Sequence, residues 1–332
     1  MSQRGFGRPA GRPYGNPTSR RKPWRAVIVG GPTAGGKSAL ALAVAREFGG
    51  AVINADSLQV YRELPVLTAQ PTAAACAAAP HRLYGFLPAT ERSSAARWAA
   101  SARAEIDAAA AQGRLPIVVG GTGLYLRALQ HGLAPVPEIP AAVRSAAKER
   151  LVTLGKAAFH AELVRRDPAM AARVQPSDAQ RMVRAWEVLE ATGRSLADWQ
   201  ARQEGPIDGP RFLTFVLMPE RAALYAACDT RFRAMVEQGA LGEAAALRDL
   251  DPGLPAFKAL GLRELIAHLR GESTLEAAIA AAQQATRRYA KRQMTWFRNQ
   301  MPEGRQIVPG GLGEQLSERI FPEIYNFIRN SG

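Results

Sequence analysis

Residues 31–38 carry the clearest chemical signal in the chain, because GPTAGGKS matches the phosphate-binding pattern G-x-x-x-x-G-K-[ST] at every fixed position. Glycines lack a Cβ, so successive backbone N–H groups can converge on one anion at the start of the following helix. Lys37 adds a positive charge over the outer phosphate oxygens, and the Ser38 hydroxyl can bind Mg²⁺. The residues expected to hold a diphosphate or triphosphate are Gly31, Thr33, Ala34, Gly35, Gly36, Lys37 and Ser38.

Both flanks of this loop have the pattern that the motif requires. An apolar, β-branched run precedes it at residues 24–29, and apolar residues at helical spacing follow at residues 39–48. These flanks argue against the alternative, a glycine-rich turn with a chance lysine. A second strand is expected at residues 51–55, which makes a parallel strand–helix–strand unit with a right-handed crossover. Asp56 follows that strand and is expected to face the loop, because ligands bind at the carboxyl ends of such strands.

A third buried strand is expected at residues 115–119, and it ends in the run GGTG that contains Thr122. An ordinary phosphate-loop NTPase would place an aspartate at such a strand end, as a ligand linked to Mg²⁺. Thr122 supplies a neutral hydroxyl instead, and the glycines permit close backbone approach to a ligand. This departure argues against simple ATP hydrolysis. Local roles remain as alternatives: a helix cap or magnesium ligand for Asp56, and a turn hydroxyl for Thr122.

The last long helix is expected at residues 274–298, and its final part is rich in cations. Residues 286–298 hold five Lys or Arg and no acid, with Tyr289, Trp296 and Phe297 among them. Cations beside aromatic rings suit single-stranded nucleic acid, where phosphates meet charge and bases meet rings. The alternative is an amphipathic helix with its aromatic side chains in the core and its arginines in water.

Composition indicates a folded, basic protein. The 332 residues are 47% hydrophobic and carry a net charge of +14. Residues 1–25 contribute seven Lys or Arg and no acid, so the rest of the chain keeps +7 (14 − 7). That excess favours a polyanionic partner, with ordinary solvated surface charge as the alternative.

Several classes of protein are disfavoured by the same composition. No stretch approaches the roughly 18 uninterrupted apolar residues of a membrane span, and the N-terminus lacks the pattern of a secretion signal. We therefore expect a cytoplasmic protein without a membrane partner. Cys76 and Cys228 lie far apart beside alanines, which predicts reduced, buried thiols rather than a disulfide or a metal site.

The order of elements predicts an α/β fold, a P-loop NTPase-like parallel sheet flanked by helices, with a helical insertion domain. Residues 1–23 are expected to form a disordered basic arm, because prolines and arginines leave little to bury. Residues 24–137 and 206–332 are expected to form the core with its C-terminal helices. Residues 138–205 look helical between a proline-rich segment and a Gly-Pro pair, which predicts the insertion.

Seven fragments, taken in order along the chain, resemble the tRNA dimethylallyltransferases, also called isopentenyl-tRNA transferases. They are GPTAGGKS at 31–38, NADSLQVYRELPVLTAQP at 54–71, PHRLYGF at 80–86, the strand with GGTGLY ending at 125, QRMVRAWEVLEATGRSL at 180–196, FKALGLREL at 257–265 and TRRYAKRQMTWFRNQ at 286–300. The resemblance is collinear across nearly the whole folded chain. It implies transfer of a dimethylallyl group from dimethylallyl diphosphate to the exocyclic amine of the adenosine 3′-adjacent to the anticodon, with release of diphosphate.

The resemblance also implies roles for single residues. Asp56 and Thr122 are expected to be catalytic, the carboxylate as general base or amine-orienting group and the hydroxyl as a hydrogen-bonding group near the reacting centre. Arg231 corresponds to an arginine that helps to hold the pyrophosphate, with an exposed helix arginine as the alternative. The adenine is expected to leave its stack and enter a channel between core and insertion.

The insertion and the last helix are expected to hold the tRNA through its anticodon stem-loop. Mg²⁺ at Ser38 is the expected cofactor, and a monomer is the expected state. Besides the segment 259–264, the residues implied to face the tRNA are Asp56, Ser57, Leu58, Gln59, Thr122, Arg144, Gln180, Arg181, Met182, Val183, Arg184, Lys291, Arg292, Gln293, Trp296 and Arg298.

Four positions depart from the family pattern, and these departures concern affinity rather than reaction class. Gly35 stands where Ser is usual, Gln70 where Lys or Arg is usual, Ser93 where Tyr is common and Trp186 where Leu is common. Three other functions fit part of the sequence: a P-loop small-molecule kinase or NTPase that uses ATP, an adenine-nucleotide isopentenyltransferase, and a non-catalytic RNA-binding protein with a vestigial loop.

Overall fold

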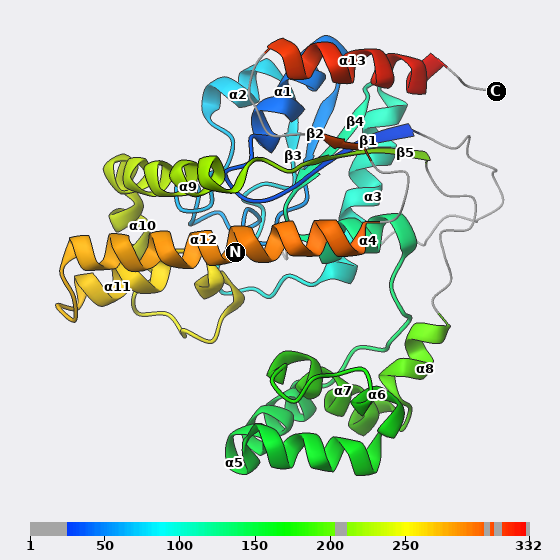
Figure 1. Ribbon diagram of the computed structural model, residues 1–332, viewed down its shortest axis with the longest axis vertical. Helices are drawn as coiled ribbons and strands as arrows, with labels where there is room; N and C mark the ends of the chain where they lie inside the picture. The colour runs from blue at the N-terminus through cyan, green and yellow to red at the C-terminus, as the bar shows by residue number, and fades with distance from the viewer. Residues whose placement is uncertain (1–24, 203–210, 302–305, 309–313, 330–332) are drawn as a thin grey trace, which may run out of the picture.

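A parallel sheet forms the centre of the molecule (Figure 1). The computed structural model describes residues 25–202, 211–301, 306–308 and 314–329. Within these residues the sheet has six strands in the order β3-β2-β4-β1-β5-β6, and all neighbouring pairs are parallel. The predicted P-loop-like α/β fold is confirmed. The strands are β1 Arg25–Gly30, β2 Ala51–Asn54, β3 His81–Arg82, β4 Pro116–Gly120, β5 Arg211–Leu217 and β6 Gln306–Val308.

Helices cover both faces of this sheet, which explains why its central strands are continuously apolar. Alternate side chains of β1 point to opposite faces: Val27 and Val29 pack under one helical layer and Ile28 under the other. The first layer is α1 Lys37–Glu47 with α13 Glu314–Arg329, and the second is α3 Ala95–Ala111, α4 Gly123–His131 and the end of α12 Leu275–Gln300 (Figure 1). Because parallel strands all end at one edge, the loops after β1, β2 and β4 meet there.

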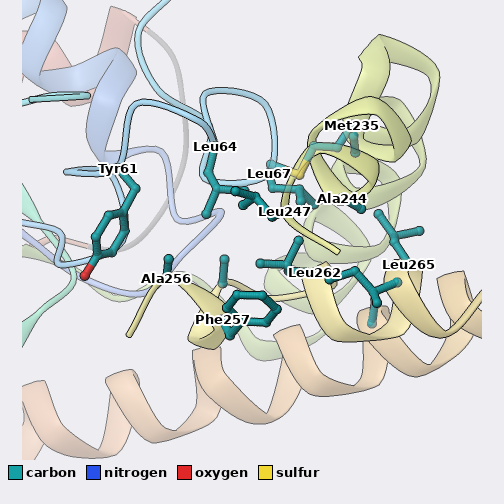
Figure 2. Packing of buried hydrophobic residues seen from close by; sticks show 14 of the residues in the cluster. Tyr61, Leu64, Leu67, Met235, Ala244, Leu247, Ala256, Phe257, Leu262 and Leu265 are labelled. Atoms are coloured by element: carbon teal, nitrogen blue, oxygen red, sulfur yellow. The ribbon is translucent and has the colours of Figure 1, made fainter. Parts of the chain in front are cut away.

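A third apolar cluster lies beside the sheet and joins the loop at residues 58–70 to the C-terminal helices. Figure 2 shows Leu64 and Leu67 of this loop packed toward Met235 and Leu262, with Tyr61 farther along the same cluster. The loop leads into the short helix α2 Ala73–Ala78. The helical elements around the cluster are α9 Arg221–Met235, a π-helical turn Val236–Ala240, α10 Leu241–Leu247, a 3₁₀ turn Pro255–Lys258 and α11 Leu262–Leu269.

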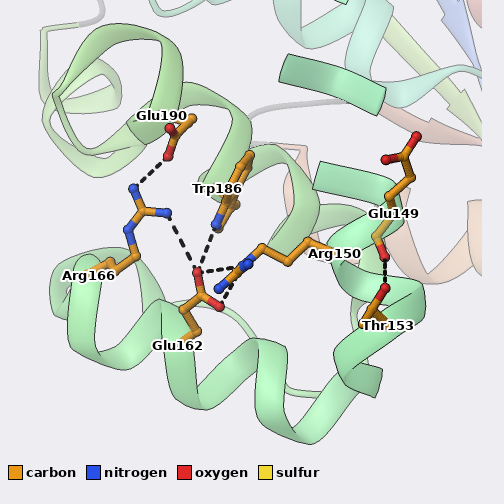
Figure 3. A network of polar contacts seen from close by, with 7 residues as sticks. All are labelled: Glu149, Arg150, Thr153, Glu162, Arg166, Trp186 and Glu190. Atoms are coloured by element: carbon orange, nitrogen blue, oxygen red, sulfur yellow. Dashed lines mark hydrogen bonds and ion pairs between the residues drawn. The ribbon is translucent and has the colours of Figure 1, made fainter. Parts of the chain in front are cut away.

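Residues 138–202, the described part of the predicted helical insertion 138–205, contain four helices with a core of their own, drawn apart from the sheet in Figure 1. They are α5 Ala141–Arg166, α6 Pro168–Ala171, α7 Ala179–Thr192 and α8 Leu196–Ala201. A buried carboxylate, Glu162, lies among three donors: Arg150 at 2.7 Å, Arg166 at 3.6 Å and the indole N–H of Trp186 at 3.3 Å (Figure 3). Trp186 thus supplies a hydrogen bond that the common Leu could not. The predicted basic arm, residues 1–23, lies outside the described residues.

Both cysteines are free thiols, and one prediction about them is wrong. Cys228 is buried, but Cys76 is exposed, because α2 buries none of its residues. Across the described residues, no helix combines the length and the apolar character needed to cross a bilayer.

Candidate active site

The phosphate loop lies between the end of β1 and the start of α1. Its turn is closed by a hydrogen bond from the Gly35 N–H to the Pro32 carbonyl, at 3.1 Å. A Cβ on Gly35 would lie 2.9 Å from that carbonyl oxygen, so glycine suits this tight turn where the family usually has serine. Gly36 is the N-cap of α1 and has a left-handed backbone (φ 84°). Ser38 is exposed in the first turn of α1, directly after the loop.

Lys37 folds over this loop and donates a hydrogen bond to the Pro32 carbonyl at 2.6 Å. Burial lowers the pKa of its ammonium to about 8; the charge of Asp56 opposes that shift and the charge of Arg231 adds to it. An anion bound next to this lysine would raise its pKa again, because the anion stabilises the charged form. The three charged groups therefore lie within electrostatic reach of one another.

Arg231 comes from α9, nearly two hundred residues after the loop, and donates a hydrogen bond to the Thr33 hydroxyl. Burial lowers the pKa of its guanidinium, while Cys228 and Asp56 raise it. An arginine stays protonated at physiological pH even so. A second cation thus faces the phosphate loop at a place that only the fold determines.

Asp56 lies on a tightly bonded loop after β2. The buried amide of Asn54 holds this loop from both sides: its Oδ1 accepts from the Asp56 N–H at 2.7 Å, and its Nδ2 donates to the carbonyls of Asp56 and Leu83 at 3.0 and 2.9 Å. One carboxylate oxygen of Asp56 accepts from the Leu58 N–H at 2.9 Å. One oxygen of the carboxylate therefore satisfies a nearby backbone N–H, as a capping residue would. The Asp56 side chain also lines the pocket described below.

Thr122 lies in the turn after β4, and its hydroxyl accepts a hydrogen bond from the Ser57 N–H at 3.0 Å. The Thr122 N–H in turn donates to the Ala55 carbonyl at 3.3 Å. These two bonds place Thr122 next to the Asp56 loop. Tyr289 of α12 also faces Thr122, and burial raises the pKa of its phenol, with the charge of Asp56 adding to the rise.

One pocket is lined by some of these groups and by apolar side chains, which we call its polar end and its apolar wall; Lys37 and Thr122 are not among its lining residues. The polar end includes Thr33, Asp56 and Arg231. The carboxylate of Glu243 shapes part of the wall, because it accepts from the N–H groups of Val66 and Leu67 at 2.6 and 2.8 Å. The other lining residues are Leu58, Leu67, Thr68, Cys228, Phe232, Met235, Leu260, Thr286 and Tyr289.

The segment 259–264 leads into α11, with Ala259 and Leu262 buried. The other residues predicted to face tRNA lie in three places. Asp56 to Gln59 and Thr122 lie at the carboxyl edge of the sheet, with Leu58 and Asp56 in the pocket. Arg144 lies in α5 and residues 180–184 lie in α7, both in the insertion. Within this run Gln180 and Arg181 are exposed and Val183 and Arg184 half-buried, whereas Met182 is fully buried in the insertion core.

The third group lies on α12, and its members point in different directions. Lys291, Arg292 and Arg298 are exposed and Trp296 is half-buried. Gln293 is buried, with 5% of its surface exposed, and its amide is bonded inside the protein. Gln70, which replaces a usual cation, also turns inward and donates to the Tyr61 carbonyl at 2.8 Å.

Most residues of the apolar wall could not be assigned to a pocket from the sequence. Leu67, Phe232 and Met235 come from segments about 165 residues apart along the chain, and nothing in their local pattern distinguishes a pocket wall from a core. Leu58, Leu67 and Leu260 lie inside fragments that carry the family resemblance, which placed Leu58 and the segment of Leu260 at the tRNA rather than in an apolar wall. No pattern in the sequence marked Glu243, because a single acid in a helix is usually solvated.

Comparisons of the sequence with known proteins find a consistent set of relatives. The family model described as IPP transferase matches residues 59–300, and one described as isopentenyl transferase matches residues 25–85. The chain is 58% identical to the tRNA dimethylallyltransferase of Rhodospirillum centenum over 87% of its length and 93% of the relative's. It is 55% identical to that of Paramagnetospirillum magneticum, over 92% and 96% of the two chains.

Solved structures give the same picture. The tRNA isopentenylpyrophosphate transferase of Bacillus halodurans is 33% identical, with a TM-score of 0.65 over 92% of this chain and 95% of its own. A eukaryotic dimethylallyltransferase, solved acting on tRNA, is 25% identical, with a TM-score of 0.80 over 93% and 80%.

Proposed function

Because the chain belongs to the IPP transferase family, we infer that it is an enzyme that transfers a dimethylallyl group to tRNA. The donor that we propose is dimethylallyl diphosphate, and the acceptor is the exocyclic amine of the adenosine 3′-adjacent to the anticodon. One observation carries the proposal: a single pocket holds Thr33 of the phosphate loop, Asp56 and Arg231 at its polar end and an apolar wall beside them.

The two halves of this pocket match the two halves of the donor. Leu67, Phe232 and Met235 offer an apolar surface to a short branched hydrocarbon, whose transfer from water is favourable. Lys37 and Arg231 offer positive charge to the diphosphate, with the main-chain amides of the loop behind them. A nucleoside triphosphate would leave this apolar wall without a matching group.

The chemistry is a displacement at the allylic carbon. The lone pair of the adenine amine forms the new carbon–nitrogen bond while the carbon–oxygen bond to diphosphate breaks, and the amine then loses one proton. Asp56 accepts that proton or the hydrogen bond that precedes its transfer. Lys37 and Arg231 offset the negative charge that develops on the departing diphosphate.

We propose Mg²⁺ as the cofactor, with one protein ligand next to the phosphate loop. Among the described residues no cluster of His, Cys, Asp and Glu could hold a metal alone, but Mg²⁺ is usually bound by few protein groups together with substrate phosphates. The exposed hydroxyl of Ser38, beside Lys37, is a suitable protein ligand. When bound, the ion would neutralise charge on the leaving diphosphate.

We propose that the anticodon stem-loop contacts two basic surfaces. Lys291 and Arg292 lie on the outer side of α12, and Arg181 is exposed on α7 of the insertion. In Figure 1 α12 lies between the sheet and the insertion, so an RNA held by both would pass near the pocket. The target adenine must leave its stack to reach Asp56.

We also propose that the enzyme acts as a cytoplasmic monomer. The phosphate loop, Asp56 and Arg231 already meet within one copy of the chain, which supports an active monomer. A tRNA substrate is consistent with the cytoplasm.

A mass-spectrometric assay tests the proposal. Purified protein, dimethylallyl diphosphate, Mg²⁺ and unmodified tRNA should yield a mass gain of one dimethylallyl group on a single adenosine. Parallel reactions with AMP as acceptor, and with ATP alone, test the two enzymatic alternatives. Modification of AMP but not tRNA, or rapid ATP hydrolysis without tRNA, would replace the proposal; no product from any acceptor would leave RNA binding as the function.

A further inference from the structure

Gln293 is a buried side chain that lies between two loops of the active site. Its Oε1 accepts a hydrogen bond from the Thr33 N–H at 2.8 Å, and its Nε2 donates to the Gly121 carbonyl at 2.9 Å. Thr33 belongs to the phosphate loop and holds Arg231 through its hydroxyl. Gly121 immediately precedes Thr122. One amide group therefore links the diphosphate end of the site to the turn that carries Thr122.

The amide of Gln293 packs directly against the backbone of the turn. A Cβ on Gly121 would lie 2.2 Å from Gln293 Nε2 and 3.1 Å from the Gly31 carbonyl oxygen, so helix, turn and phosphate loop meet at this point. Three residues further along the same helix face, the ring of Trp296 covers Gly123, where a Cβ would lie 2.4 Å from the ring. The glycines of this turn thus admit the protein's own helix α12, where the sequence suggested a ligand.

The opposite side of α12 carries the cations that we assign to tRNA. Lys291 and Arg292 are exposed, one or two residues from Gln293, so helical geometry turns them away from the buried amide. Gln293 has both ends of its amide engaged inside the protein and little exposed surface, which does not suit a direct RNA contact. The same turn of helix therefore faces RNA on one side and the reaction site on the other.

We propose that Gln293 is a positioning residue for catalysis: it holds the phosphate loop and the Thr122 turn in one register, from the helix whose outer face binds tRNA. The proposal rests on the proposed function above. A buried primary amide suits the task, because it can accept from one loop and donate to the other through one planar group.

Replacement by glutamate isolates this role. In Gln293→Glu the side chain can still accept from Thr33, but an ionised carboxylate cannot donate to the Gly121 carbonyl and repels it. We expect kcat/KM for dimethylallyl diphosphate to fall about 10- to 100-fold near neutral pH, and the deficit to shrink as the pH is lowered and the carboxyl regains a proton. Gln293→Met, which can neither accept nor donate in this way, should show a deficit that does not depend on pH.

The matched control is Gln284→Glu, the same charge change on an exposed position of the same helix, which should keep the wild-type pH profile. The affinity for unmodified tRNA, measured by filter binding, should stay within about twofold of the wild type in all variants. A parallel loss of tRNA affinity and kcat/KM, a Gln293→Glu profile of wild-type shape, or a fall in Tm of more than about 10 °C would overturn the proposal. Absence of product with the wild-type protein would instead count against the proposed function. Calorimetric titration of the wild type and the Gln293 variants with pyrophosphate and Mg²⁺ would still show whether Gln293 positions the phosphate loop.

Discussion

The Ser57 N–H donates a hydrogen bond to the Thr122 hydroxyl over 3.0 Å, between residues 65 positions apart. This bond ties the loop after β2, which carries Asp56, to the turn after β4. The hydroxyl thus accepts across the sheet edge from a loop that is distant in sequence, rather than from its own turn. The proposed base and the proposed hydroxyl are held by one short connection, which limits how far either can move during the reaction.

Asp56→Asn should abolish most turnover without loosening the loop. An asparagine oxygen can still accept from the Leu58 N–H, so the local bond survives while the charge is lost. We expect kcat to fall by about 100- to 10,000-fold, in the range of a lost general base, with tRNA affinity unchanged. Single-turnover rates and filter binding measure the two quantities, and an equal loss in both would mean that Asp56 binds RNA rather than acting in catalysis.

The rate should depend on pH through Lys37. Only the ammonium form attracts diphosphate, and its pKa is about 8, so kcat/KM for the donor should fall as the pH rises through 8. In Lys37→Arg the side chain stays charged over this range, so the fall of kcat/KM above pH 8 should disappear. The overall rate should still be lower, because a planar guanidinium does not replace a point charge. An unchanged alkaline limb in Lys37→Arg would assign that limb to another group.

The same lowered pKa has a consequence for stability. The folded protein releases the Lys37 proton more readily than the unfolded chain, whose lysine has the ordinary value of 10.5. The cost of burying the charge is therefore present below pH 8 and is relieved between 8 and 10.5. Lys37→Met should consequently flatten the rise of stability with pH in this window, as measured by urea unfolding.

Arg231→Gln should weaken donor binding specifically. The amide can still reach the Thr33 hydroxyl, but it carries no charge toward the diphosphate. A charged hydrogen bond contributes about 1.5–3 kcal/mol, so the Kd for pyrophosphate should rise roughly 10- to 150-fold. Calorimetry measures this Kd, and Arg233→Gln, an exposed neighbour on the same helix, is the matched control; equal effects of the two changes would show that Arg231 acts only through general charge.

Lys291→Ala should weaken tRNA binding in a salt-dependent way. Lys291 is exposed on the outer side of α12, where one lost phosphate contact should lower the slope of log K against log salt by about 0.7–0.9. The value of kcat at saturating tRNA should be unchanged. A fall in kcat with an unchanged salt slope would contradict the assignment of this helix face to RNA.

Glu162→Gln should destabilise the insertion. Burial of Glu162 would raise its pKa, but the hydrogen bonds from Arg150 and Trp186 and the charges of Arg150 and Arg166 lower it overall (Figure 3). A lowered carboxyl pKa stabilises the fold above its ordinary value of 4.5, and this contribution is lost as the pH falls below that value. Because both arginines are partly exposed, the cost should be about 1–3 kcal/mol in urea unfolding at neutral pH.

Glu190→Gln is the control for that change, since it removes an exposed partner of Arg166 and should cost less than about 1 kcal/mol. If Glu162→Gln lost no more stability than Glu190→Gln, the buried network would contribute nothing to the insertion. The hydrogen bond from the Trp186 indole would then not explain why tryptophan stands at this position.

The phosphate loop, the parallel unit of β1 and β2, the buried strand β4 and the position of Asp56 at a strand end could all be predicted from the sequence. Each depends on a pattern within 10 to 20 consecutive residues, where local geometry and side-chain alternation act directly. The strands β3 and β6 could not, because two and three residues are too few to show an alternation. The exposure of Cys76 was missed because its alanine-rich surroundings resemble a core.

The pocket itself was decided by tertiary structure. Met235 and Leu67 form one wall although their sequence neighbourhoods differ in no way from ordinary core segments. Gln293 lies 260 residues from the Thr33 N–H that it accepts from. The sequence by itself determined what chemistry the loop and the carboxylate could perform, since that follows from residue type and local backbone; the packing of α9 and α12 against the sheet decided which groups meet, because burial and long-range hydrogen bonds depend on the whole fold at once.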